Sequence, residues 1–233
     1  SQNRVKCHLC FRGCEIGDGK RGFCRNRENL KGTLYSMVYA KPAALQIDPI
    51  EKEPSFHMIP GTSIFCTATA SCNFRCKFCQ NWHLSQRGME EIPYQNLKPE
   101  EVVRKAIQQR CETVSFTYSE PTVFYEYMFD IVRIAKRDRL KTLIHTNGSM
   151  STDPLLALLK YMDAVTVDLK AFTEKFYREI SSSELEPVLH TLRTVRSYGR
   201  YLEIVNLVIP TLNDDPKDIR EMCIWIKANL GKD

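Results

Sequence analysis

Three cysteines within eight residues are the part of this chain best suited to chemistry. Cys72, Cys76 and Cys79 are spaced C-x3-C-x2-C in the run Ser-Cys-Asn-Phe-Arg-Cys-Lys-Phe-Cys-Gln, and no fourth cysteine lies nearby in the sequence. Three thiolates on one loop can hold three corners of a [4Fe–4S] cluster and leave the fourth iron open. Because an open iron can bind a small molecule and give it an electron, this spacing predicts a catalytic cluster rather than a structural one.

A structural zinc site is the main alternative for the same loop. Zinc usually takes four nitrogen or sulfur ligands, and His83, four residues after Cys79, could complete such a set. The cysteine spacing favours the iron–sulfur cluster over zinc. Phe78 directly precedes Cys79, where an aromatic ring could lie against a flat base. Phe74 and Trp82 flank the loop, where apolar side chains could exclude water from the metal.

The cysteine loop resembles the signature of the radical S-adenosylmethionine (SAM) enzymes, C-x3-C-x-aromatic-C. Further segments narrow the resemblance to the radical SAM proteins of the AmmeMemoRadiSam system, which are related to the pyruvate formate-lyase activating enzymes. These segments are Asp48–His57, which begins Asp-Pro-Ile-Glu-Lys-Glu-Pro, Gly61–Phe65, Cys79–Trp82, Tyr118–Thr122, His145–Gly148 and Val167–Phe172. The similarity extends from Cys7 to the last residue and so covers nearly the whole chain.

The resemblance implies a reaction. In that family the amine and carboxylate of SAM chelate the open iron, and one electron from the reduced cluster splits the sulfonium bond. The resulting 5′-deoxyadenosyl radical abstracts hydrogen from a substrate, while the protein positions the groups and excludes competing reactions. The resemblance also implies an external electron donor of the flavodoxin or ferredoxin type.

The substrate is left open between two classes. One is a partner protein that receives a glycyl radical, and the other is a different modification of a small molecule, a protein side chain or RNA. A non-catalytic iron–sulfur or zinc-binding module, acting as a partner in a complex, is the alternative to an enzyme.

Four further cysteines form a second set near the N-terminus. Cys7, Cys10, Cys14 and Cys24 are spaced C-x2-C-x3-C-x9-C among several glycines. A bound metal could organise a segment with too few apolar residues to fold alone. Tetrathiolate zinc and a second iron–sulfur cluster both fit the spacing, and disulfides are the third option. Since seven of the ten cysteines fall in two metal-binding sets, we expect a reducing, cytoplasmic location.

Composition limits the other possibilities. A chain of 233 residues can build one substantial core with a small appendage. The net charge of +5 is mild, and the basic stretches at 20–31 and 133–141 fit solvated surfaces better than a nucleic-acid-binding face. No apolar run is long enough to suggest a membrane span, and the polar start Ser-Gln-Asn-Arg is no signal peptide.

Residues 63–233 alternate short apolar runs with amphipathic stretches, which predicts an α/β fold with a parallel sheet covered by helices. We expect strands at 63–70, 113–117, 141–146, 164–169 and 202–209, and helices at 99–110, 121–137, 154–160, 174–198 and 216–229. The resemblance implies a partial TIM-like (β/α) barrel of six strands, so this domain shows five β/α units and is C-terminally incomplete. Residues 1–62 form a cysteine-rich metal-binding segment and lead-in.

Polar motifs follow successive predicted strands, at the edge where β/α barrels hold their active sites. We therefore expect Ser119-Glu120, Thr146-Asn147, Asp168-Leu-Lys170 and the Asn206 region to converge with the cysteine loop. Simpler explanations are that Glu120-Pro121 opens a helix and that Asp168 and Lys170 form a plain ion pair.

The resemblance assigns roles to these residues. It implies that Ser119 and Glu120 contact the methionine amine of SAM, although Tyr118-Ser119 replaces the Gly-Gly of the family's Gly-Gly-Glu turn. Thr146 and Asn147 would bond the ribose or the carboxylate, and Phe78 would contact the cofactor.

Two charged groups and one amide complete the candidate site. Asp168 and Lys170 would hold the methionine end of SAM and the substrate, so Lys170 joins the three cysteines as a candidate catalytic residue. Asn206 lies in a predicted buried strand, where a polar group needs a partner such as SAM. His145 stands where the activating enzymes carry an aspartate, while Cys66, Cys111 and Cys223 are expected to be incidental thiols.

Overall fold

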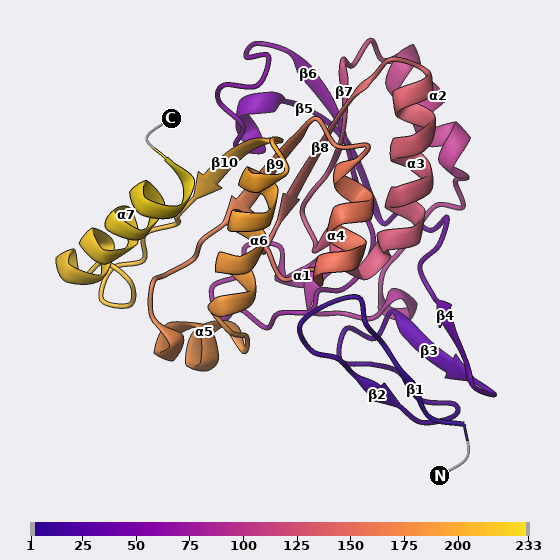
Figure 1. Cartoon of the computed structure of the whole chain (residues 1–233). Coiled ribbons are helices and arrows are strands. Elements are labelled where there is room, and N and C mark those ends of the chain that lie inside the picture. The colour runs from indigo at the N-terminus through magenta and orange to yellow at the C-terminus, as the bar shows by residue number, and fades with distance from the viewer. Residues whose placement is uncertain (1–2, 232–233) are drawn as a thin grey trace.

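A six-stranded sheet forms the centre of the computed structural model, which describes residues 3–231 (Figure 1). Five neighbouring strands are parallel and follow one another in chain order. They are β6 (Ser63–Ala68), β7 (Thr113–Phe116), β8 (Lys141–Thr146), β9 (Ala164–Asp168) and β10 (Tyr201–Val205). The prediction of an α/β fold with five parallel strands is confirmed.

The sixth strand, β5 (Ala44–Pro49), lies antiparallel to β6 at one edge of the sheet. Its register places Gln46 opposite Cys66 and Asp48 opposite Ile64. We predicted no strand here and had grouped these residues with the N-terminal segment. The strand ends in proline, which an edge strand tolerates because its outer N–H groups need no partner within the sheet.

Helices connect the strands and cover one face of the sheet. They are α2 (Pro99–Gln108), α3 (Tyr125–Arg137), α4 (Thr152–Leu159), α5 (Glu174–Ser181), α6 (Glu186–Ser197) and α7 (Pro216–Leu230). The apolar stripe of α3, which includes Tyr127, Ile131 and Ala135, is fully buried against the sheet side of the main core. Pro99 begins α2, followed by two glutamates that suit the helix dipole.

Alternate strand residues face two different cores. Phe65, Phe116 and Val165 belong to the large core beneath the helices. Cys66 and Leu143 belong to a smaller core on the other face, together with Ile50 and Met58 from the segment after β5. This second face carries polar as well as apolar side chains, so it is the face that can enclose a site.

The N-terminal segment forms two small antiparallel hairpins and lies beside the carboxyl-end region of the sheet (Figure 1). The hairpins pair β1 (Val5–Lys6) with β2 (Glu15–Ile16) and β3 (Arg27–Leu30) with β4 (Thr33–Ser36). The segment contacts the cysteine loop directly, because Ser71 Oγ donates to the Cys24 carbonyl at 2.6 Å and Phe11 packs edge-on against Phe74.

Most predicted boundaries shift by one or two residues, and two elements differ more. Strand β10 ends at Val205 rather than 209, because the Asn213 side chain bonds the backbone of Leu207 and Ile209 and turns the chain out of the sheet. The helix expected at 121–137 begins as a 3₁₀ turn, η3 (Pro121–Phe124), before α3. Within residues 3–231, none of the helices is both long and apolar enough to cross a membrane.

Candidate active site

A cavity of about 240 Å³ lies at the carboxyl ends of the parallel strands. The cysteine loop after β6 forms one side, and the loops after β7, β8 and β9 form the others. The candidate residues that line it are Cys72, Cys76, Phe78, Cys79, Ser119, Glu120, Thr146, Asn147, Asp168 and Lys170. The structure thus brings together side chains that come from four separate loops of the sequence.

The three cysteines do not surround one point. Within residues 3–231, no group of three or more histidine, cysteine, aspartate or glutamate side chains is placed to hold a single metal ion. Tetrahedral zinc needs all its ligands around one centre, and His83 does not line the cavity. In a [4Fe–4S] cluster each cysteine binds a different iron, so its sulfurs stand further apart. The positions of the three cysteines are therefore compatible with a cluster, whose cysteine ligands do not share one metal ion.

Several hydrogen bonds fix the cysteine loop. Arg75 N donates to the Ser181 carbonyl and Lys77 N to the Ile180 carbonyl, each at 2.9 Å. The Arg75 guanidinium also donates to the carbonyls of Cys72 and Phe74 at 2.6 and 2.7 Å. These bonds hold the loop backbone against the end of α5, which orients the thiols before any cofactor binds.

Donors also reach the cysteine sulfurs. Phe74 N lies 3.3 Å from Cys72 Sγ, and Asn147 Nδ2 lies 3.8 Å from the same sulfur. Ser85 Oγ is 3.1 Å from Cys79 Sγ. Burial raises the pKa of the Cys72 and Cys76 thiols, so bound metal is needed to keep them as thiolates at neutral pH. Hydrogen bonds to ligating sulfur are a recognised means of tuning a cluster's potential.

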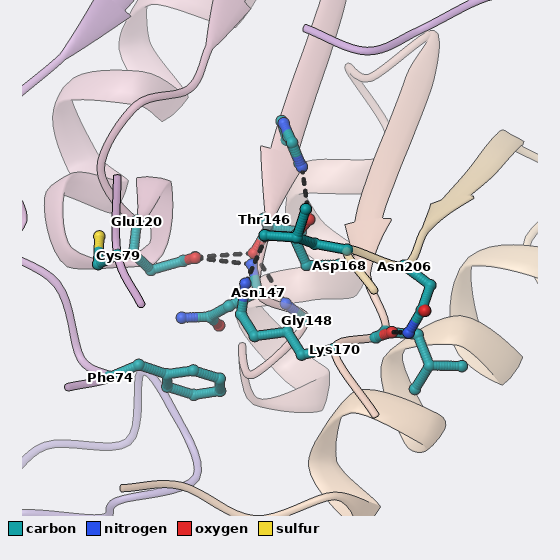
Figure 2. A network of polar contacts seen from close by, with 12 residues as sticks. Phe74, Cys79, Glu120, Thr146, Asn147, Gly148, Asp168, Lys170 and Asn206 are labelled. Atoms are coloured by element: carbon teal, nitrogen blue, oxygen red, sulfur yellow. Dashed lines mark hydrogen bonds and ion pairs between the residues drawn. The ribbon is translucent and has the colours of Figure 1, made fainter. Parts of the chain in front are cut away.

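Glu120 joins the ends of β7 and β8 (Figure 2). Its Oε1 accepts from Thr122 N at 3.0 Å, from Thr122 Oγ1 at 2.5 Å and from Thr146 Oγ1 at 2.7 Å, while Oε2 accepts from Asn147 N at 2.8 Å. Burial raises the pKa of this carboxyl group, although the bonds from Asn147, Thr122 and Thr146 act in the opposite direction. Oε2 accepts only this one hydrogen bond from the described residues, and a carboxylate oxygen can accept about two, so Oε2 keeps room for one more donor.

The predicted helix start at Glu120 is also present. The side chain caps η3 by accepting from Thr122 N, so one carboxylate both opens the helix and faces the cavity. Its neighbour Ser119 is 9% exposed, and its hydroxyl is buried without a hydrogen-bond partner in the described chain. An unpartnered buried hydroxyl on the cavity wall is available to a ligand.

Gly148 shapes the loop after β8. Its φ is +73°, a left-handed conformation that favours glycine, and a Cβ there would stand 2.9 Å from Val167 Cγ1 and 3.1 Å from Val188 Cγ1. The preceding Asn147 is held by Asn73, whose Oδ1 accepts from Asn147 Nδ2 at 2.8 Å. The β8 loop is therefore packed tightly and tied to the cysteine loop.

An ion-pair chain crosses the cavity wall. Asp168 Oδ2 lies 2.7 Å from Lys170 Nζ, and Asp168 Oδ1 lies 3.0 Å from His145 Nε2. Burial by itself would raise the pKa of Asp168, but the charges of Lys170 and His145 outweigh it and lower the pKa well below its usual value. The Asp168 charge in turn raises the pKa of Lys170 and of His145 against the effect of their burial. These two ion pairs keep Asp168 ionised and Lys170 protonated.

The structure does not place Asn206 in this cavity. Its Nδ2 donates to the Leu169 carbonyl at 2.6 Å and lies beside Met222 of α7. The residue follows the end of β10, because the strand stops one residue earlier. The amide is partly buried rather than buried, and the backbone after β9 supplies its partner.

The four N-terminal cysteines lie around one small space of about 20 Å³. Cys7 N donates to the Cys14 carbonyl at 2.9 Å, which closes the first hairpin. Burial raises the pKa of Cys24 to about 11 and also raises that of Cys10. The four thiols gather in one place, yet they too are not arranged around a single ion.

A second cavity, of about 270 Å³, adjoins the first and was missed by the sequence analysis. Both share Gln80, Asn81, Thr117, Tyr118 and His145 as lining residues. The remaining wall includes Asp48, Glu53 and Cys66. The two acidic residues belong to the Asp-Pro-Ile-Glu-Lys-Glu-Pro run, in which four of the seven residues are charged. This density of charge is the feature of the sequence that could have indicated a polar site here.

The radical SAM superfamily model matches residues 67–223 of the chain. This chain belongs to the radical SAM superfamily. It is 43% identical over 231 residues to an uncharacterized protein of Methanocaldococcus jannaschii, covering 99% of the chain and 68% of that protein. It is 26% identical over 160 residues to the pyruvate formate-lyase-activating enzyme of Clostridium pasteurianum, covering 67% of the chain and 66% of the enzyme.

Solved radical SAM structures share the fold. Streptococcus suis SuiB superposes with a TM-score of 0.57 at 17% identity, over 71% of this chain and 36% of that one. A radical SAM methyltransferase from Sphaerobacter thermophilus gives 0.56 at 18% identity, over 74% of this chain and 55% of that one. The chain spans about two thirds of the two relatives named above. The sheet is thus the partial barrel that the superfamily shares.

Proposed function

We propose that this chain is the SAM-binding part of a radical SAM enzyme of the AmmeMemoRadiSam type, with a [4Fe–4S] cluster on Cys72, Cys76 and Cys79. The single observation that supports this most is the cavity where those three cysteines meet the polar ends of three parallel strands. The cluster and SAM, when bound, supply one-electron cleavage of the sulfonium bond and a 5′-deoxyadenosyl radical for hydrogen abstraction.

The residues of the chain bind and orient these groups. The carboxylate of Glu120 has an acceptor position left for the methionine amine, and the unpartnered Ser119 hydroxyl lies beside it. Protonated Lys170 suits a carboxylate, and its Nζ lies 5.8 Å from the centre of the Phe78 ring. Phe78 in turn packs on Phe176, which leaves an apolar wall against which a base can lie.

Asn147 and Thr146 act mainly by positioning. The Asn147 side chain is bonded to Asn73 and to Ser149, and Thr146 donates to Glu120. We therefore assign these two side chains to holding the cysteine loop and the Glu120 carboxylate in place. Contact with the ribose of SAM would then come from the backbone of Asn147 and Thr146 and from side-chain acceptor positions that are still free. A cavity lined by positioned polar side chains supports an enzyme rather than a non-catalytic metal-binding module.

The N-terminal cysteines are proposed to hold a structural zinc ion or a second iron–sulfur cluster. Four thiols gathered in a segment made of two short hairpins support a metal that stabilises that segment. An external one-electron donor of the flavodoxin or ferredoxin type would reduce the cluster.

Anaerobic reconstitution followed by low-temperature electron paramagnetic resonance tests the proposal. We expect a reduced cluster signal that changes when SAM is added, and 5′-deoxyadenosine after incubation with dithionite. Cys72→Ala should abolish both, whereas Cys223→Ala, at an exposed thiol on α7, should retain them. A signal that ignores SAM would contradict the proposal. Metal analysis should give about four irons plus one zinc, or about eight irons.

A further inference from the structure

The second cavity contains a buried carboxylate without a cation. Glu53 is 5% exposed, accepts from the Ser115 hydroxyl and lies 3.8 Å from Cys66 Sγ. It makes no ion pair within residues 3–231, whereas Asp48 on the same wall is paired with Lys52 at 2.6 Å and also accepts from Tyr118. Of the two acidic groups in this cavity, Glu53 is therefore the one without an ion-pair partner among the described residues.

Burial of this kind is costly unless something offsets it. An ionised carboxylate out of water needs a partner cation or enough hydrogen bonds, and otherwise takes up a proton. Burial raises the pKa of Glu53 to about 7, although the Ser115 hydrogen bond and the nearby charge of His145 act to lower it. The group is thus balanced between its two protonation states, and a cation placed beside it would favour the ionised one.

The cavity has the space to admit such a cation. Its volume of about 270 Å³ far exceeds the roughly 10–15 Å³ that a single water needs, so a small organic molecule can fit. It adjoins the first cavity, because Thr117, Tyr118 and His145 line both. A ligand in the second cavity would lie next to the cofactor site.

The polar groups of the wall discriminate between ligand classes. A carboxylate or phosphate would meet Asp48 and Glu53, and the one lysine on the wall, Lys52, is already paired and its side chain is 62% exposed at the rim. A neutral alcohol would leave Glu53 without compensation. A protonated amine would supply the missing charge and a hydrogen-bond donor together.

We infer that the second cavity is the substrate subsite, and that it takes a small molecule whose protonated primary amine binds beside Glu53. The inference rests on the proposed function, because it assumes that hydrogen abstraction takes place in the adjoining cavity. It assigns to the Asp-Pro-Ile-Glu-Lys-Glu-Pro run the task of recognising substrate. Lys52 and Tyr118 hold Asp48, so that Glu53 alone carries the charge that selects the ligand.

Binding of a matched pair of probes tests the inference. Anaerobically reconstituted protein with SAM is titrated at pH 8 with n-propylamine and with 1-propanol, and binding is followed by saturation-transfer NMR. We expect the amine to bind at least about tenfold more tightly than the alcohol, a difference of about 1.4 kcal/mol. Equal affinities for the two probes would overturn the inference.

Two variants from the same run locate the effect. Glu53→Gln should weaken propylamine binding by about tenfold or more. Glu51→Gln is the matched control, because Glu51 lies outside the cavity and accepts only from Gly61 N at 2.6 Å. It should bind the amine as the wild type does. Amine binding that survives Glu53→Gln, or that is lost equally in both variants, would refute the assignment.

A pH titration of the wild type serves if Glu53→Gln does not fold. Propylamine, like lysine, stays protonated between pH 6 and 8, while a carboxyl group with a pKa near 7 changes from about one-tenth to nine-tenths ionised. Affinity should therefore rise about tenfold over this range. Loss of the His145 proton would act in the same direction. The titratable groups that face Glu53 are Asp48, Lys52, Cys66, Tyr118 and His145. A flat profile would overturn the inference.

SAM binding measured in the same wild-type sample separates the two proposals. Protein that binds and cleaves SAM but does not prefer the amine refutes only the subsite. Protein that does not bind SAM refutes the proposed function, whatever the amine does.

Discussion

Replacing Gly148 by alanine tests how tightly the β8 loop must pack to form the site. A residue with a side chain at φ +73° costs about 1–2 kcal/mol relative to glycine. The added Cβ would also stand 2.9 Å from Val167 Cγ1 and 3.1 Å from Val188 Cγ1, and overpacking of this kind typically costs about 1–3 kcal/mol. We therefore expect Gly148→Ala to lose about 2–5 kcal/mol of unfolding free energy.

Gly199→Ala is the matched control for this prediction. Gly199 has a φ of +74°, but no atom lies within 4 Å of its ideal Cβ position. It should show only the backbone cost of about 1–2 kcal/mol. Because each kcal/mol shifts the melting temperature of a chain this size by about 2–4 °C, the two variants should melt several degrees apart.

The difference in melting temperature between the two variants is measured by thermal denaturation followed by circular dichroism, with reconstituted protein under anaerobic conditions. SAM affinity should also fall in Gly148→Ala and not in Gly199→Ala, because Val167 immediately precedes Asp168 and would have to move. If both variants lose the same stability, then contact with Val167 and Val188 is not what requires glycine, and the argument from packing fails.

Three further outcomes are expected. Asp168→Asn should destabilise the protein by about 1–3 kcal/mol at pH 7, because it leaves Lys170 without its partner. Since the pKa of Asp168 is lowered by folding, this difference should persist from pH 7 to about pH 4 and shrink below it in denaturation curves. The raised pKa of Glu53 has the opposite sign: folding stability should fall as pH rises from about 4 to 7, and Glu53→Gln should lack that decline. Cys14→Ser should lower the content of the N-terminal metal and also weaken the SAM-dependent resonance signal, because the N-terminal segment supports the cysteine loop; an unchanged signal would contradict that dependence.

The parallel part of the fold was predictable because its strands are short apolar runs buried on both faces. Runs such as Thr113–Phe116 and Ala164–Asp168 have almost no exposed residue, and the intervening amphipathic stretches have a clear helical period. Residues placed directly after those strands were then expected to converge, because parallel strands end at one edge. Glu120, Asn147 and Asp168 do meet there.

Strand β5 and the second cavity were not predictable by the same reasoning. Asp48 reaches the cavity only because the antiparallel register with β6 aligns it with Ile64, and Cys66 meets Glu53 only through the turn that follows. Neither the register between β5 and β6 nor the conformation of the turn can be predicted from a local sequence pattern. The prediction that Asn206 lines the cavity was wrong for a related reason. The side chain of Asn213, seven residues later, bonds the backbone so that the strand ends before Asn206.

The contacts between the N-terminal segment and the cysteine loop bear on how the protein matures. Arg12 Nε donates to the Asn73 carbonyl at 2.6 Å, and Arg75 donates to the Phe23 carbonyl at 2.9 Å, so each piece supplies hydrogen-bond partners that the other lacks. A version of the chain beginning at residue 63 would carry every proposed cluster ligand yet expose the underside of its loop to water. We therefore expect iron insertion to require a folded N-terminal segment. Damage to that segment would then lower the iron content of the proposed cluster site without altering any of its ligands.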